Sequence, residues 1–141
     1  MCVFINMVVE DEVCIPQVVG GNAGIDLIAI CDGTIECGQQ LSVSTGLSMA
    51  IPTGHKGIIR GRSGMRLKYM VEPFRGVIDS SYRGTINVLL INYSPILPFN
   101  FKRGDRIAQL CIEVSPGVTL SRVSSLGGTF RGSAGFGSTG R

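Results

Sequence analysis

The sequence predicts an all-β domain, either a small sandwich or a barrel with jelly-roll-like connections. Three observations support this class. Short apolar runs with the two-residue period of strands recur along the chain, 20 glycines and 6 prolines separate them, and no amphipathic helix of useful length is present. The 141 residues suit one domain, and hydrophobic residues make up 44% of the chain, which is sufficient for a core.

The first half of the chain contains three candidate strand regions. Residues 3–9 and 25–31 are short apolar runs. Residues 41–51 place apolar side chains at alternate positions, and the alternation breaks only at Thr45. That period is typical of a half-buried strand, which has one buried and one exposed face.

The second half of the chain predicts two more strands and one helical turn. Residues 86–91 are nearly all apolar, so this strand is expected to be buried on both faces. Residues 108–114 alternate apolar and polar side chains again. A short helical turn is expected only over residues 65–70.

Composition limits the possible partners and locations. Charged residues make up 16% of the chain, below the usual ~25%, so part of the surface is expected to be hidden in an oligomer. The net charge of +3 gives no argument for nucleic-acid binding and suits a small anionic ligand. No apolar stretch approaches the ~20 residues needed to cross a membrane, and no signal peptide is expected. The chain is expected to be intracellular, either cytoplasmic or nuclear.

Cysteine and histidine usage argues against a metal centre. The five cysteines form no C-x-x-C pair, which predicts reduced thiols in an intracellular protein. His55 is the only histidine and lies in a predicted turn over residues 52–57. A structural zinc site is therefore not expected, and no nucleophile elbow accompanies His55 to form a Ser-His-Asp triad.

The composition changes at Gly127, which divides the chain into a β domain over residues 1–126 and an arm over residues 127–141. The arm is mostly Gly, Ser, Thr and Arg. It is either a flexible tail or a segment that orders when it closes over a ligand. Arg131, Phe136 and the glycine-rich backbone would suit the second role, because they can grip a phosphate and cover a base.

Residues 76–84 hold the strongest candidate for catalysis. Asp79 follows three small or apolar residues, and Tyr82 comes three positions later. A carboxylate in that setting can act as a general base beside a flat ligand, although an isolated Asp also commonly serves to form a turn. Together with residues 61–64, residues 103–110 and the arm, this segment indicates a nucleotide phosphate site.

Five motifs in this order resemble those of the deoxyuridine triphosphatase (dUTPase) family, and the resemblance spans residues 23–140. The motifs lie at residues 23–27, 61–65, 76–84, 103–110 and 131–140. The resemblance implies a homotrimer of jelly-roll-like subunits that hydrolyses dUTP to dUMP and pyrophosphate with Mg²⁺. It further implies active sites shared between subunits, an arm that crosses from a neighbour, and a role in keeping uracil out of DNA while supplying dUMP.

The resemblance also assigns roles to residues. Asp79 is expected to activate the water that attacks the α-phosphorus. Tyr82 is expected to pack on the deoxyribose and exclude a 2′-hydroxyl. Asp26 is expected to reach Mg²⁺ through water and the triphosphate. Backbone groups of a hairpin are expected to read uracil, at Gly76, Val77, Ile78 and Asn87.

The remaining implied roles concern the phosphates and the arm. Phe136 is expected to stack on uracil, whereas Asp105 and Arg106 are expected to pair structurally without taking part in the chemistry. The phosphate contacts are expected from the second, fourth and fifth motifs: Arg62, Ser63, Gly64, Gln109, Arg131, Gly137, Ser138 and Thr139.

Three positions depart from the family pattern. Ile25 stands where tyrosine is common, which changes packing and leaves Asp26 in place. Ala134 stands where the arm often has glycine, and a positive φ there would cost about 1–2 kcal/mol. Phe74 and Arg75 replace small residues, and they either narrow the uracil site or point to solvent.

Three other functions are compatible with such a fold. A dCTP deaminase would need its own acidic catalytic residue, and the compact length and the motif at residues 77–79 argue against it. A binding protein that has lost catalysis would be expected to lack motif residues, which this chain retains. A purely structural trimeric β domain would not explain five ordered motifs.

Overall fold

The computed structural model describes residues 2–135 and 137. Their secondary structure is almost entirely β, which confirms the predicted class. The elements are β1 (Asn6–Val9), the 3₁₀ turn η1 (Glu12–Cys14), β2 (Ile25–Ile28), β3 (Gly33–Ile35), β4 (Gln40–Ser44), β5 (Leu47–Ala50), β6 (His55–Arg60), α1 (Ser63–Tyr69), β7 (Val71–Pro73), β8 (Val77–Ile78), β9 (Asn87–Asn92), β10 (Phe99–Phe101) and β11 (Arg106–Val114).

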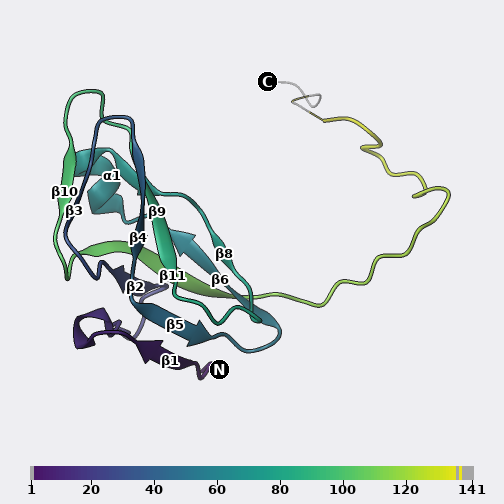
Figure 1. The fold of residues 1–141 in the computed structure, drawn as a ribbon. Helices are drawn as coiled ribbons and strands as arrows, with labels where there is room; N and C mark the ends of the chain where they lie inside the picture. The colour runs from purple at the N-terminus through teal and green to yellow at the C-terminus, as the bar shows by residue number, and fades with distance from the viewer. Residues whose placement is uncertain (1, 136, 138–141) are drawn as a thin grey trace.

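Two antiparallel sheets enclose the core (Figure 1). One has the strand order β2-β11-β6-β8, and the other has the order β4-β9-β7. Two strand pairs, β1-β5 and β10-β3, complete the sandwich. The largest fully buried side chains come from nearly every element, and they include Leu27, Ile35, Val43, Leu47, Ile51, Val71, Ile86, Val88, Leu90, Phe101, Ile107 and Leu110.

The predicted strand region at residues 41–51 forms two strands in different sheets. One strand was expected here, but the structure interrupts it at residues 45–46, where the alternation of apolar side chains is also interrupted. The Thr45 side chain is buried, and its hydroxyl donates a hydrogen bond to the carbonyl of Ile86 at 2.7 Å. Gly46 has a φ of 59°, and a Cβ there would lie 2.6 Å from Ile30, so the bend requires glycine.

The expectation that residues 86–91 are buried on both faces is wrong for the single chain. Val88 and Leu90 face the core, whereas Leu89 and Ile91 are half-buried. The physical reason is that only one face of the β4-β9-β7 sheet packs against the other sheet. A uniformly apolar strand in a two-layer fold therefore leaves apolar side chains available on its outer face.

The short helix is α1, close to the turn predicted at residues 65–70. It ends at Met70, which has a left-handed φ of 57° and donates its N–H to Arg66 O at 3.1 Å. Across the described part of the chain, none of the helices has the length and apolar character to span a membrane. All five cysteines are free thiols in the structure.

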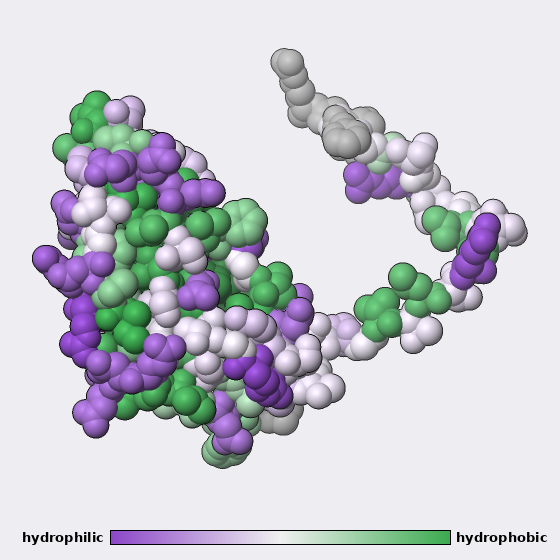
Figure 2. Space-filling view, in the orientation of Figure 1, coloured by the Kyte–Doolittle hydropathy of each residue, from purple (hydrophilic) through white to green (hydrophobic). Residues whose placement is uncertain are grey.

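The C-terminal segment leaves the sandwich after β11. Its last backbone link to the body is the hydrogen bond from Ser115 N–H to Gly54 O at 2.7 Å. Residues 116–135 form no strand or helix and extend away from the body (Figure 1). Figure 2 shows apolar side chains along this segment, and those exposed are Val118, Leu120, Val123, Leu126 and Phe130.

Candidate functional site

A cavity of about 980 Å³ lies where β2, β11 and the start of α1 meet. The strand register explains why its polar side chains converge. Gln109 on β11 pairs with Asp26 on β2 on one side and with Arg60 on β6 on the other. Because β6 leads directly into residues 61–64, the phosphate loop predicted there is delivered to the same edge.

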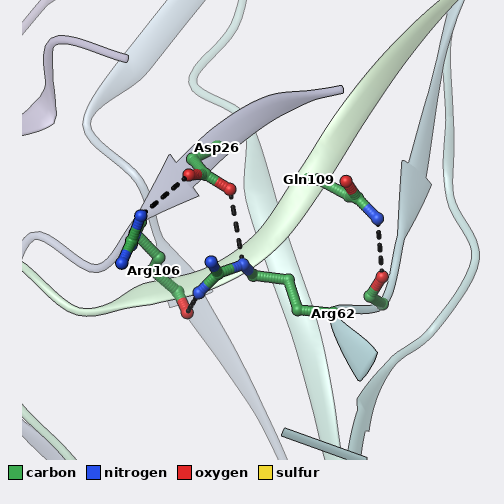
Figure 3. Close-up of polar contacts among 5 residues, drawn as sticks. Asp26, Arg62, Arg106 and Gln109 are labelled. Carbon is green, nitrogen blue, oxygen red and sulfur yellow. Dashed lines mark hydrogen bonds and ion pairs between the residues drawn. The ribbon is translucent and has the colours of Figure 1, made fainter. Parts of the chain in front are cut away.

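Asp26 is held between two guanidinium groups in this cavity (Figure 3). Its Oδ1 lies 3.3 Å from Arg62 Nε, and its Oδ2 lies 3.5 Å from Arg106 Nη1. Arg62 Nη1 also donates to the carbonyl of Arg106 at 3.3 Å. The described contacts therefore place Arg106 against Asp26, whereas the expected partner Asp105 accepts a hydrogen bond from Lys102 N at 2.8 Å.

Gln109 is oriented by its neighbours. Its Nε2 donates to Gly61 O at 2.9 Å. Gly24 leaves room for the Gln109 side chain, because a Cβ at residue 24 would lie only 2.7 Å from Gln109 Oε1. Gly24 and Arg106 are site residues that the sequence reasoning missed. Gly24 stands inside the first motif, so its position was a usable signal, while the role of Arg106 depends on the β2-β11 register.

Arg62, Ser63 and Gly64, the predicted phosphate loop, line the cavity together with Asp26 and Gln109. Arg62 is the residue that precedes α1, and Ser63 begins it. A second cavity of about 600 Å³ adjoins the first and shares Arg62, Ser63 and Gln109 with it. Five of the predicted site residues are thus brought together in one chain.

Residues 79–84 form a turn after β8. Tyr82 N–H donates to Asp79 O at 3.0 Å, and the Tyr82 hydroxyl donates to Thr85 O at 2.9 Å. The ring lies against Gly84, where a Cβ would be 2.5 Å from the hydroxyl oxygen. Within the described residues the Asp79 carboxylate has no hydrogen bond or ion pair, so it is free to bind water.

The expected uracil hairpin does not form by pairing of its two sides. Val77 and Ile78 pair with β6, whereas Asn87 begins β9 and pairs with β4. The carbonyl of Gly76 accepts a hydrogen bond from Ile59 N at 2.9 Å. The two segments belong to different sheets because β6 offers a free edge to residues 77–78.

Asp79 and Gln109 lie far apart within one chain. Ile78 pairs with Gly57, so Asp79 lies level with Lys56, four residues from the partner of Gln109 on β6. Four residues along a strand and two strand spacings across the sheet correspond to about 16 Å. The single chain therefore divides the predicted site residues into two groups.

The arm contributes only local contacts among its described residues. Arg131 Nε donates to Ala134 O at 2.8 Å. Gly137 has a φ of 81°, whereas Ala134 does not have a positive φ, so the strain considered for this alanine is absent in this conformation. The predicted contacts of Phe136, Ser138 and Thr139 lie outside the described residues.

The surroundings of the site are rich in arginine and poor in acidic clusters. The hydrogen bond and charge of Glu113, 2.7 Å from Arg60, raise the pKa of the Arg60 guanidinium. In the described ranges, 2–135 and 137, no three His, Cys, Asp or Glu side chains are grouped to hold a metal ion. A cation at this site would therefore need oxygen ligands from a bound anion.

Comparisons with known proteins identify the family. The chain matches the dUTPase family profile over residues 12–140. It is 47% identical over 126 residues to the deoxyuridine 5′-triphosphate nucleotidohydrolase of Methylocella silvestris, covering 85% of this chain and 78% of that protein. It is also 45% identical over 120 residues to that of avian adenovirus 8, covering 85% and 73%.

Solved structures with low sequence identity share the fold. A mutant dUTPase of Staphylococcus bacteriophage 80alpha with dUpNHpp has a TM-score of 0.90 at 21% identity, covering 98% of this chain and 99% of that one. A mutant dUTPase of phage phi11 of S. aureus, described with a structural Mg(II) ion, has a TM-score of 0.81 at 19% identity, covering 87% and 98%. Fold, motif order and sequence identity agree, and the chain belongs to the dUTPase family.

Proposed function

We propose that the protein hydrolyses dUTP to dUMP and pyrophosphate. The observation that supports this most directly is the cavity in which Asp26, Arg62 and Gln109 converge beside a loop with the family's phosphate-binding sequence. Two arginines against one carboxylate leave positive charge for an anionic ligand. The reaction would limit uracil incorporation into DNA and supply dUMP, which fits an intracellular location, cytoplasmic or nuclear.

Asp79 would act as the general base. Its carboxylate would orient a water molecule and accept its proton as the water oxygen bonds to the α-phosphorus. The bond from that phosphorus to the bridging oxygen of the β-phosphate would break, and pyrophosphate would leave. The lack of described partners for this carboxylate supports the role, because a salt bridge would compete for its lone pairs.

The remaining groups would bind and select the nucleotide. Tyr82 would lie against the deoxyribose, where its ring leaves no room for a 2′-hydroxyl. The phosphate chain would contact Arg62, Ser63, Gly64 and Gln109, and the arm would add Arg131, Gly137, Ser138 and Thr139, with Phe136 on the base. Uracil would be read by backbone groups at Gly76, Val77 and Ile78 and by Asn87.

Asp26 would hold Mg²⁺ through water. The residues fit this group: the Asp26 carboxylate borders the cavity, and its contacts to the two guanidinium groups, at 3.3 and 3.5 Å, are long enough to leave lone pairs for water. Mg²⁺ keeps several waters and accepts phosphate oxygens, so one carboxylate suffices. The ion would neutralise part of the negative charge of the phosphates.

A homotrimer with shared active sites would reunite the two groups of residues. Asp79 must reach the α-phosphorus through one water, while Arg62 and Gln109 must touch the same phosphate chain. A backbone separation of about 16 Å between Asp79 and Gln109 favours phosphate contacts from another copy over contacts from the same chain. A neighbouring copy that presents its own Arg62 and Gln109 to Asp79 would satisfy both conditions. Exposed apolar side chains along residues 116–130 are available for contacts between the copies.

The test is pyrophosphate release from dUTP with Mg²⁺, alongside dTTP, dCTP and UTP. We expect release from dUTP only, and loss of turnover with retained nucleotide binding in Asp79→Asn. A chain that ends before Gly127 should lose most activity. Glu36→Gln, which changes an exposed carboxylate that has no hydrogen bond or ion pair among the described contacts, is the matched control. Full activity of Asp79→Asn, or ammonia release from dCTP, would contradict the proposal.

A further inference from the structure

The second cavity contains a positive charge to which the proposed function assigns no role. Four arginines line it: Arg60, Arg62, Arg66 and Arg75. Three of them have a carboxylate partner, since Arg60 pairs with Glu113, Arg62 with Asp26, and Arg66 with Glu72. Among the described contacts Arg75 has none. Its charge is the one in this cavity that no carboxylate of the described residues offsets.

The backbone fixes where Arg75 lies. The preceding residue, Phe74, donates its N–H to Leu89 O at 2.7 Å, which ties it to β9. The following residue, Gly76, accepts from Ile59 N at 2.9 Å, which ties it to β6. Arg75 is therefore clamped between the two sheets, and its Cβ position at the cavity is set by strand hydrogen bonds on both sides.

The same register places Arg75 in a row of polar side chains across the sheet. Asp26, Gln109 and Arg60 are paired in sequence across β2, β11 and β6. Because Gly76 is bonded to Ile59, Arg75 continues the row beside Arg60 on the β8 side. Two strand spacings separate it from Gln109, about 10 Å, a gap that a long arginine side chain and a chain of phosphates can bridge.

Arg75 has no carboxylate partner among the described residues, so an anion in this cavity would offset its charge, and a phosphate suits the planar donors of arginine in particular. We propose that Arg75 is a further substrate-binding residue, which contacts a phosphate oxygen of the nucleotide held by Arg62, Ser63 and Gln109 of the same chain. This inference rests on the proposed function, since it assigns the second cavity to the phosphate end of that substrate.

Affinities for ligands with different numbers of phosphates test the proposal. Calorimetry or competition would compare deoxyuridine, dUMP, dUDP and α,β-imido-dUTP on the full-length protein, its Arg75→Gln and Arg75→Lys variants, and Lys102→Gln as a control cation outside both cavities. For Arg75→Gln we expect about tenfold or more weaker binding of α,β-imido-dUTP and unchanged binding of deoxyuridine. Arg75→Lys should recover part of the loss, and Lys102→Gln should match the parent.

Turnover of dUTP gives an independent measure. If Arg75 binds the phosphates equally in the ground and transition states, Arg75→Gln should raise KM for dUTP and leave kcat unchanged. Equal weakening of deoxyuridine and α,β-imido-dUTP would overturn the proposal and place Arg75 at the base. No change with any ligand would overturn it too, and would make Arg75 a solvent-facing side chain. Failure of the unmodified protein to hydrolyse dUTP would instead refute the proposed function.

Discussion

Replacing Gly84 by alanine should weaken the selection of deoxyribose over ribose. The added Cβ would lie 2.5 Å from the Tyr82 hydroxyl oxygen and 2.7 Å from Cζ. Ordinary contact begins near 3.4 Å, so the ring must move by about 0.9 Å. That shift breaks the 2.9 Å hydrogen bond from Tyr82 to Thr85 O, which is worth about 1 kcal/mol, or about fivefold.

The assay is the ratio of kcat/KM for dUTP to that for UTP. A misplacement of this size in a binding site lowers rates by up to about 100-fold, so we expect the ratio to fall between about fivefold and 100-fold. The melting temperature should change little, because both residues lie in an exposed turn. Gly20→Ala, where an added Cβ meets nothing within 4 Å, is the control. An unchanged ratio in folded Gly84→Ala would refute the role given to Tyr82.

Three predictions concern stability and reactivity. Leu110→Ala should lower the free energy of unfolding by about 2–5 kcal/mol in denaturant melts, because Leu110 is fully buried, while Val114→Ala on the same strand should cost far less. The hydrogen bond from Arg103 N–H lowers the pKa of Asp32 below its usual value of 3.8. That carboxylate therefore stabilises the fold above this pH and stops doing so as the pH falls through its folded pKa. Asp32→Asn should lower the melting temperature at neutral pH, and its difference from the parent should shrink below about pH 4. Burial raises the pKa of Cys14, so it should react with a thiol reagent more slowly than the exposed cysteines, and equal rates would contradict its burial.

The sequence predicted the fold class and the regions of β1, β2, β4, β5, β9 and β11, because these follow from local patterns. It missed β3, β6, β7, β8 and β10, and His55, which was expected in a turn, begins β6. The break at Thr45 was visible as a gap in the alternation, and the structure explains it by the turn at Gly46. The burial of residues 86–91 was mispredicted because an apolar run shows only that both faces of a strand are apolar. It does not show whether other parts of the same chain pack against both faces.

The site was predictable in its residue types and less so in its geometry. Residue order alone could not reveal that Asp26 pairs with Arg106, because that contact depends on the register between β2 and β11. Nor could it show that Asp79 lies at the far end of the sheet from Gln109. Both facts arise from long-range strand pairing. A motif resemblance suggests the roles of residues, but it does not give their positions in the folded chain.

The C-terminal segment has a consequence for the lifetime of the protein in a cell. A copy without neighbours presents Leu120, Leu126 and Phe130 to solvent on an extended backbone, which is the form that proteases and chaperones bind. Newly made chains would be degraded until their concentration favours association, and only assembled copies would persist.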